Sequence, residues 1–202
     1  MPSNKAWEQK PAGRGCTGTR ERRRVLIMCE DSKSACDYFK SFEIDPKRAE
    51  MFSVGTGMNT DSLVEAAIEL KKEAVKRGQP YNEVWCVVDV DDHSNLQEAL
   101  SLAVRNDIKV AVSNPCFELW IYWHYADHSA FITTRQIQKK LKTRVRGYDK
   151  ELPLDFPYCE FDAARRRALS ACRDAASPCA VGDNPASTAW LVVESIKCAG
   201  GY

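Results

Sequence analysis

Short apolar runs alternate with stretches of helical periodicity along the first two thirds of the chain. Four runs of strand length lie at residues 25–29, 51–54, 84–88 and 108–112. Between them apolar side chains recur every three or four residues, as at Ala35, Tyr38 and Phe39, which is typical of amphipathic helices. Because parallel strands need crossover connections, this alternation predicts an α/β fold with an open parallel four-stranded sheet and helices on both faces.

Polar residues and prolines mark the expected helix ends. Glu30-Asp31-Ser32 is suited to capping a helix after the first strand, and the second helix is expected from about Asp61 to Lys76. Ser94-x-x-Gln97 resembles a capping box for the third helix. After the fourth strand, Asn114 is expected to cap a helix that has Pro115 at its first position and reaches about Tyr125.

These patterns divide the chain into three parts. Residues 1–23 lack periodicity and are rich in basic residues, so they predict a disordered basic arm. Residues 24–130 form the predicted α/β core. Residues 131–202 contain helical patterns near 134–146, 162–176 and 187–197, and we expect them to form a helical C-terminal extension packed on the core.

Composition favours a globular protein of the cytoplasm. The chain is 44% hydrophobic and 28% charged with a net charge of +1, so its overall charge demands no polyelectrolyte partner. The nine cysteines include no C-x-x-C pair, which argues against a zinc ribbon or a disulfide framework. We expect no membrane span and no signal peptide, because no apolar run is long enough.

Acidic residues follow two of the predicted strands. Glu30 comes directly after the first strand, Asp89 ends the third, and Asp91 lies two residues further. Carboxyl ends of parallel strands share one edge of the sheet, where ligands bind in such folds. Clustered carboxylates repel one another without a cation, and hard oxygen ligands at this density select Mg²⁺ or Mn²⁺. A bound ion would suit phosphodiester chemistry.

Two further acids belong to the candidate metal site. Asp92 extends the acidic string, and Glu118 lies in the first turn of the fourth expected helix, near the same edge. The alternative for the Asp-x-Asp-Asp string is a polar turn that caps the next helix. The alternative for Glu118 is a favourable interaction with the helix dipole, which is worth about 0.3–1 kcal/mol.

Four residues beside these acids are candidate substrate contacts. Lys33 can neutralise a phosphate, and His93 can carry a proton or bind one; each has a solvent-facing alternative. Ser113 and Asn114 lie at the end of the fourth strand, where Asn114 is also the expected cap.

Other clusters permit more than one interpretation. His124 and His128 have the spacing of zinc ligands on one helix, but no H-E-x-x-H motif or third ligand accompanies them. Trp120, Tyr122 and Trp123 crowd one helix, which indicates either core packing or a partner interface. Basic residues at 135–146 and 165–167 form solvated faces or, with the basic arm, a nucleic-acid track.

Several strings together resemble the RloB family over about residues 24–197. They are Val25-Leu26-Ile27-Met28-Cys29-Glu30, Tyr38-Phe39, Val87-Val88-Asp89-Val90-Asp91-Asp92-His93, Ser113-Asn114-Pro115-Cys116-Phe117-Glu118-Leu119-Trp120, Gly147-Tyr148-x-Lys150 and Asn184-Pro185-Ala186-Ser187-Thr188. The resemblance implies a Toprim-like fold, in which a Glu after the first strand and an Asp-x-Asp after the third form the metal and catalytic centre. Glu30, Asp89 and Asp91 match these positions.

By the same resemblance, we expect a metal-dependent nuclease in a bacterial phage-defence or abortive-infection system, working with a separate ATPase. Relatives often read Glu-Gly-x-x-Thr-Glu after the first strand, whereas this chain has Asp31 for the Gly and Ala35 for the second acid. A non-catalytic metal-binding adaptor or sensor of an ATPase complex is the second hypothesis. A receiver-like domain is a third, weakened because the strongest acid cluster follows the third strand. The choice between DNA and RNA, and homo-oligomer formation, stay open.

Overall fold

The computed structural model describes residues 22–31, 33–42, 44–90, 95–145, 148 and 151–200. The predicted basic arm lies outside these residues, except for its last two positions. A five-stranded sheet in the order β2-β1-β3-β4-β5 organises the fold. Its strands are β1 (Arg23–Cys29), β2 (Ala49–Gly55), β3 (Glu83–Asp89), β4 (Lys109–Asn114) and β5 (Ala186–Ser187).

The first four strands are parallel, as predicted, and the fifth is a correction. β1 pairs with β2 on one side and with β3 on the other, and β3 pairs with β4. β5 joins β4 in antiparallel register, with Ser113 opposite Ser187. The prediction that only helices follow residue 130 was wrong because β5 has two residues, too few to show a strand period.

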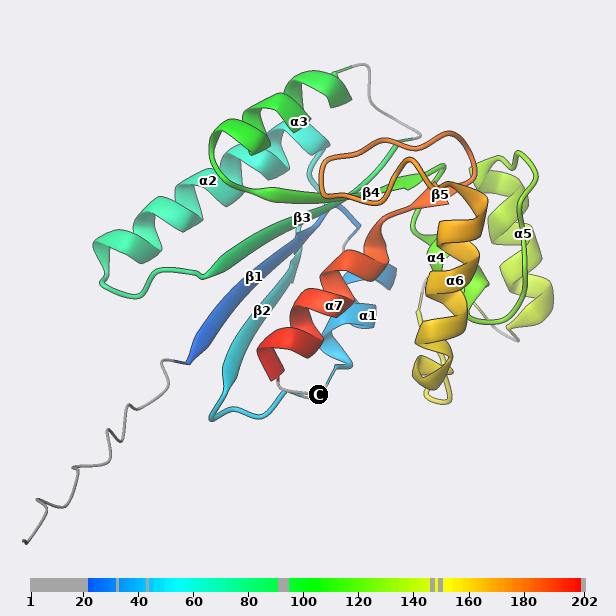
Figure 1. Ribbon diagram of the computed structural model, residues 1–202, viewed down its shortest axis with the longest axis horizontal. Helices are drawn as coiled ribbons and strands as arrows, with labels where there is room; N and C mark the ends of the chain where they lie inside the picture. The colour runs from blue at the N-terminus through cyan, green and yellow to red at the C-terminus, as the bar shows by residue number, and fades with distance from the viewer. Residues whose placement is uncertain are drawn as a thin grey trace, which may run out of the picture.

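Helices cover both faces of the sheet (Figure 1). They are α1 (Ser34–Lys40), α2 (Thr60–Lys76), α3 (Leu96–Arg105), α4 (Glu118–Trp123), α5 (Thr134–Arg144), α6 (Phe161–Ala171) and α7 (Ala189–Gly200), with a short 3₁₀ helix at Tyr158–Glu160. α2 and α3 lie on one face, and α1 and α7 lie on the other, with α4, α5 and α6 beyond β4 (Figure 1). Among the described helices, none is both long and apolar enough to cross a membrane.

Alternate side chains of the strands build two cores. Val25, Ile27 and Val87 point to the face of α1, α4 and α7, whereas Leu26 and Met28 point to the face of α2 and α3. The pleat of a strand sends successive side chains to opposite faces, so a strand buried on both sides reads as a continuous apolar run. This is why the apolar runs were visible in the sequence.

α4 is buried on every side except at Tyr122, which is partly exposed. Trp120 and Trp123 are both fully buried, and the helix packs against α5, α6 and β4. A helix that is apolar all round belongs in a core. Trp120 and Trp123 are therefore core residues with no exposed ring for a partner, whereas Tyr122 is partly buried against the same core.

The C-terminal segment completes the edge of the sheet at β4. The Val112 amide donates to the Thr188 hydroxyl at 2.8 Å, and the Thr188 amide donates to the Val112 carbonyl at 3.0 Å. Asn184 exchanges two hydrogen bonds with the Ile132 backbone, at 2.9 and 2.8 Å. The string Asn184–Thr188 thus fastens the C-terminal helices to the sheet.

Candidate carboxylate site

Glu30 and Asp89 lie at the point where the strand order reverses. β1 and β3 are neighbours, but the chain leaves them in opposite directions, through α1 and α3, and an open α/β sheet binds ligands in this crevice. The Glu30 amide donates to the Val87 carbonyl at 3.0 Å, which fixes the residue just beyond the end of β1. One Glu30 carboxylate oxygen lies 3.4 Å from the Asp89 amide, so the two acids meet at this edge.

Glu118 reaches the same place from the first turn of α4. Its side chain is only 3% exposed, and Gln138 of α5 donates to its carboxylate at 3.3 Å. A buried acid held by one neutral amide remains costly unless a cation approaches. Glu118 therefore places an acidic side chain in a part of the edge that water hardly reaches.

The neighbouring acids perturb Asp89. Burial raises the pKa of the Asp89 carboxyl well above its usual range, and the carboxylates of Glu118, Glu30 and Asp31 raise it further. Like charges that share a site disfavour ionisation of each member. Four acids from β1, β3 and α4 are therefore close enough to interact strongly.

Asp31 is held as a cap for α1. Its carboxylate accepts hydrogen bonds from the backbone amides of Lys33 and Ser34, both at 3.1 Å. Asp31 therefore binds the free amides that begin α1. The Lys33 side chain, in contrast, extends into solvent and forms an exposed pair with Glu151 at 3.7 Å.

Tyr148 is a site residue that the pattern analysis did not propose. Its buried hydroxyl makes no hydrogen bond of normal geometry within the described part of the chain, although the Ser34 side chain lies close enough to lower its pKa. Burial raises its pKa above the usual value, and the nearby Glu118 carboxylate raises it further. The string Gly147-Tyr148-x-Lys150 carried the family resemblance, and this was the signal that could have identified Tyr148.

Thr60 also lies at the edge without having been predicted. It begins α2, is 1% exposed, and its hydroxyl lies 3.4 Å from a Glu30 carboxylate oxygen. The first turn of α2 follows β2, the neighbour of β1. The rule that residues after parallel strands share one edge of the sheet could therefore have identified Thr60.

Ser113 and Asn114 bind protein rather than face the carboxylates. The buried Ser113 hydroxyl lies 2.9 Å from the Ser187 hydroxyl, and the Asn114 amide donates to the Gly182 carbonyl at 2.9 Å. The prediction that Asn114 caps α4 was wrong. α4 begins at Glu118 after Phe117, with no side-chain cap. Asn114 ends β4 instead, and its side chain fastens the loop that leads to β5.

Three of the predicted site residues, Asp91, Asp92 and His93, lie outside the described residues. Within the described ranges, no group of three His, Cys, Asp or Glu side chains is arranged to hold a metal ion. The chemistry of the donors still suits a hard divalent cation, because the Glu30 carboxylate lies beside the Asp89 amide and Glu118 is near enough to raise the pKa of Asp89.

His124 is a core residue. It is 2% exposed, and its ring nitrogens lie 3.0 Å from the Trp120 carbonyl and 3.1 Å from the Tyr38 hydroxyl. Burial lowers its pKa to about 4. With both nitrogens occupied, His124 is unsuited to the zinc pair considered with His128.

Comparisons with known proteins identify one relationship. No curated protein matched the chain in a sequence search. The profile of a family described as RloB-like protein matches residues 25–196, a range that contains β2 to β5 and all of β1 except Arg23 and Arg24.

Proposed function

The chain belongs to the RloB-like protein family, and from this premise we propose that it is a divalent-metal-dependent nuclease. Its substrate would be a phosphodiester bond of nucleic acid, hydrolysed at the edge where Glu30, Asp89 and Glu118 meet. The raised pKa of Asp89, caused by burial and by Glu118, Glu30 and Asp31, is the observation that carries the proposal. Perturbed acids in a crevice are typical of functional sites.

The proposal also includes a more specific fold type than the α/β class. We propose a Toprim-type arrangement, with Glu30 after β1 and Asp89 after β3 as its two central acids. The neighbouring strands and the 3.4 Å contact between Glu30 and the Asp89 amide support it. A role in phage defence and a separate ATPase partner rest on the family resemblance alone.

The residues fit Mg²⁺ or Mn²⁺, with Glu30, Asp89 and Glu118 as ligands and Asp91 and Asp92 as further candidates. When bound, the ion would supply Lewis acidity and offset negative charge on the phosphodiester. Gln138 orients the Glu118 carboxylate, and Thr60 lies beside that of Glu30.

Hydrolysis joins a water oxygen to phosphorus and breaks the bond to the ester oxygen, which leaves as an alcohol. The Glu30 oxygen that does not hold the ion is proposed to accept the proton of the attacking water, and the leaving oxygen would take its proton from a solvent water. The unpaired hydroxyl of Tyr148 is a hydrogen-bond donor for a phosphate oxygen. Burial around Glu118 keeps bulk water out, which strengthens these interactions.

A second function is supported by the first motif. Ala35 stands where relatives carry a second acid, and its side chain is 2% exposed and packed in the core. A protein with fewer acids at this edge could bind a cation and respond to it without catalysis. This alternative is a metal-binding adaptor or sensor of an ATPase complex.

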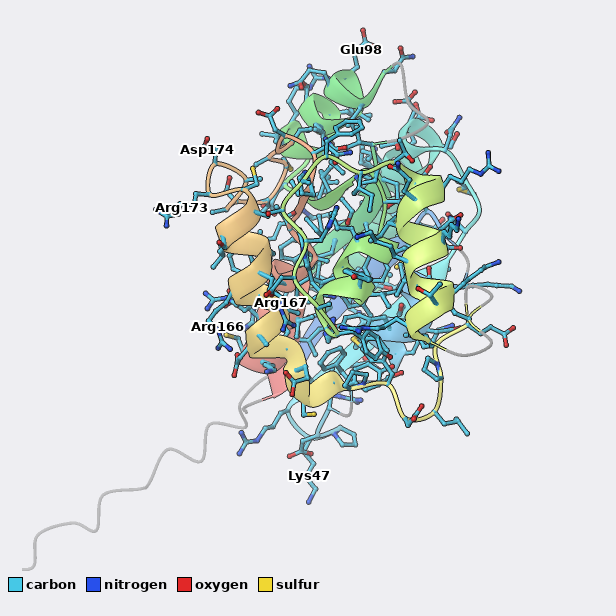
Figure 2. The ribbon with its side chains drawn as sticks, turned by 90° about the vertical axis from the view of Figure 1, so that its right-hand side faces the viewer. Lys47, Glu98, Arg166, Arg167, Arg173 and Asp174 are labelled. Atoms are coloured by element: carbon cyan, nitrogen blue, oxygen red, sulfur yellow. The ribbon has the colours of Figure 1, made fainter. Side chains whose placement is uncertain are left out.

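Cleavage of end-labelled DNA and RNA by the purified protein separates the two functions. With Mg²⁺ or Mn²⁺, the nuclease should cut, and Asp89→Asn and Glu30→Gln should each reduce the rate by roughly 100-fold or more, the scale of losing a principal electrostatic group. Asp174→Asn is the matched control, since Asp174 is exposed on the loop after α6 (Figure 2). The assay is repeated with the ATPase encoded beside the gene.

Phage protection by the same variants decides the alternative. If cells that express Asp89→Asn and Glu30→Gln at normal levels remain protected, catalysis at this edge is not the function. The adaptor would then replace the nuclease.

A further inference from the structure

A basic surface lies between α5 and α6, on the side of the molecule that faces the viewer in Figure 2. It consists of two neighbouring hollows that share His128, one of about 460 Å³ and the other of about 340 Å³. We call it the α5–α6 surface. Four cationic side chains line it against one acid, Asp127; the cations are Lys139, Lys140, Arg166 and Arg167.

Helical spacing explains why these cations gather. Lys139, Lys140 and Thr143 lie on one face of α5, because residues three and four apart are neighbours on a helix. Arg166 and Ser170 are four apart on α6 and line the other hollow. The segment that joins α4 to α5 lies between the two helices (Figure 2).

The arginine triplet of α6 divides among three environments. Arg165 pairs with Glu194 at 2.8 Å and lies over the Trp190 ring, away from the hollows. Arg167 is held by Asp127 and by the Trp123 carbonyl. Arg166 projects outward from α6 (Figure 2) and forms no ion pair with another residue of the described ranges, so its guanidinium can bind a phosphate.

Phe131 adds an exposed aromatic ring to this basic surface. Its side chain is 72% exposed, and it lines the smaller hollow with Gln136, Lys139 and Lys140. An exposed phenylalanine costs solubility and contributes nothing to the core. An aromatic ring among cations is the combination that stacks a base while the cations hold the backbone.

α5 connects this surface to the carboxylates. Gln138 faces inward and donates to Glu118, whereas its neighbours Lys139 and Lys140 face outward into the smaller hollow. Adjacent residues of one helix therefore contact the candidate site and the basic surface. A strand bound along α5 would pass within one helix diameter of the acids, about 10 Å.

We infer that the α5–α6 surface binds single-stranded nucleic acid, with a base stacked on Phe131 and phosphates held by Lys139, Lys140 and Arg166. This inference rests on the proposed function for its substrate class, and it assigns that substrate a surface. A duplex has no free base face to offer Phe131, so the ring selects single strands. The positive charge of the surface alone would bind single strands and duplexes alike.

Fluorescence anisotropy tests the inference with the full chain, EDTA and no divalent cation, so that cleavage cannot interfere. The probes are a labelled single strand of mixed sequence, as DNA and as RNA, and a labelled DNA duplex. Single strands should bind more tightly than the duplex. Phe131→Ala should weaken single-strand binding by about tenfold, within the range for loss of one stacked base, and should leave duplex binding unchanged. Phe131→Trp should bind like the unaltered protein.

A charge-matched pair of variants tests the cations. Lys139→Ser with Lys140→Ser should lower the slope of log affinity against log salt by about 1–2, because each phosphate contact releases a counterion. Lys72→Ser with Lys76→Ser removes the same charge from exposed positions on α2, across the sheet, and should leave the slope unchanged. Folding of each variant is checked by circular dichroism.

Normal single-strand binding by Phe131→Ala, or equal slopes for the two lysine pairs, would overturn the inference. So would the absence of binding to any probe. Cleavage that persists with these outcomes would leave the proposed function standing. Conversely, Phe131-dependent binding without cleavage in Mg²⁺ or Mn²⁺ would support the binding surface and contradict the proposed nuclease activity.

Discussion

The two ends of β3 hold acidic side chains in opposite electrostatic settings. Glu83 begins the strand among cations and hydrogen-bond donors, and Asp89 ends it among other acids. The strand is the same, and only the edge of the sheet differs. A setting that satisfies every charge stabilises the fold, whereas a setting that leaves charges opposed requires something from outside the chain.

The geometry at Glu83 is that of a completed ion-pair network. Lys109 lies 2.9 Å from its carboxylate, Ser195 donates at 2.6 Å, and Arg23 binds the other oxygen. Burial alone would raise the pKa of Glu83, but hydrogen bonds from Ser195 and Lys109 lower it below the usual value. This edge joins β1, β3, β4 and α7 and has the character of a structural clamp.

The largest pH effect on stability should come from a third region, the core around His124. Burial lowers the pKa of His124 to about 4, so the folded protein excludes a proton that the unfolded chain binds below about 6.5. Stability should be unaffected above pH 6.5 and should fall by about 3 kcal/mol as the pH drops to 4. Urea unfolding between pH 4 and 8 measures this loss of unfolding free energy. His124→Phe should make the unfolding free energy nearly independent of pH in this range.

Glu83→Gln should cost about 1–2 kcal/mol, because it removes the acid from two cations that are about two fifths exposed and so partly screened by solvent. Its pKa is lowered, so the stabilisation is present above the unfolded value near 4.3 and is lost as the pH falls through the folded value. Urea unfolding at pH 7 measures the loss. An unchanged unfolding free energy would show that the clamp contributes no stability.

Magnesium should distinguish the two edges. At one hundred times its dissociation constant, a ligand specific for the folded state adds about 2.7 kcal/mol of stability. Mg²⁺ or Mn²⁺ should therefore raise the melting temperature of the unaltered protein and of Glu83→Gln by equal amounts, and that of Asp89→Asn hardly at all. Differential scanning fluorimetry with and without EDTA provides the measurement. Equal shifts in all three proteins would place the ion elsewhere.

The smallest effect is expected for Asp89→Asn without metal. The raised pKa of Asp89 means that ionisation opposes folding, with the penalty absent below the unfolded value and growing as the pH rises through the folded value. Removing the charge should leave stability at pH 8 unchanged or raise it by up to about 1 kcal/mol. A loss of stability at that pH in EDTA would mean that the acid pairs with a cation of the chain.

Much of the fold was visible in the sequence because the sheet is buried on both faces. The apolar runs of β1, β3 and β4, and the spacing of Ala35, Tyr38 and Phe39 in α1, follow directly from the periods of the two structures. The order of the strands required the structure, since periodicity does not encode which strands are neighbours. β5 was missed because its pairing depends on residues far away in the sequence.

The acids of the candidate site were predictable because each ends or follows a strand or, like Glu118, begins the helix after one. Glu30 and Asp89 could be placed at one edge from the parallel topology. The partners of Ser113 and Asn114 could not be predicted from the topology. These side chains bind Ser187 and Gly182, which come from the C-terminal part of the chain. Tyr148 and Thr60 carry no acidic signal, and only tertiary packing brings them beside the acids.

Because the C-terminal segment pairs with β4, the sheet can be completed only after the last part of the chain has been synthesised. The hydrogen bond between Val112 and Thr188 joins residues 76 positions apart, so β4 leaves the ribosome long before its last neighbour exists. Contacts this distant in sequence form late in folding. If the protein cuts nucleic acid, the sheet at β4 stays incomplete while the nascent chain is still beside messenger and ribosomal RNA, so the chain would not yet be active there. A chain ending at Ala180 should accordingly lack the cooperative unfolding transition of the full chain in near-ultraviolet circular dichroism.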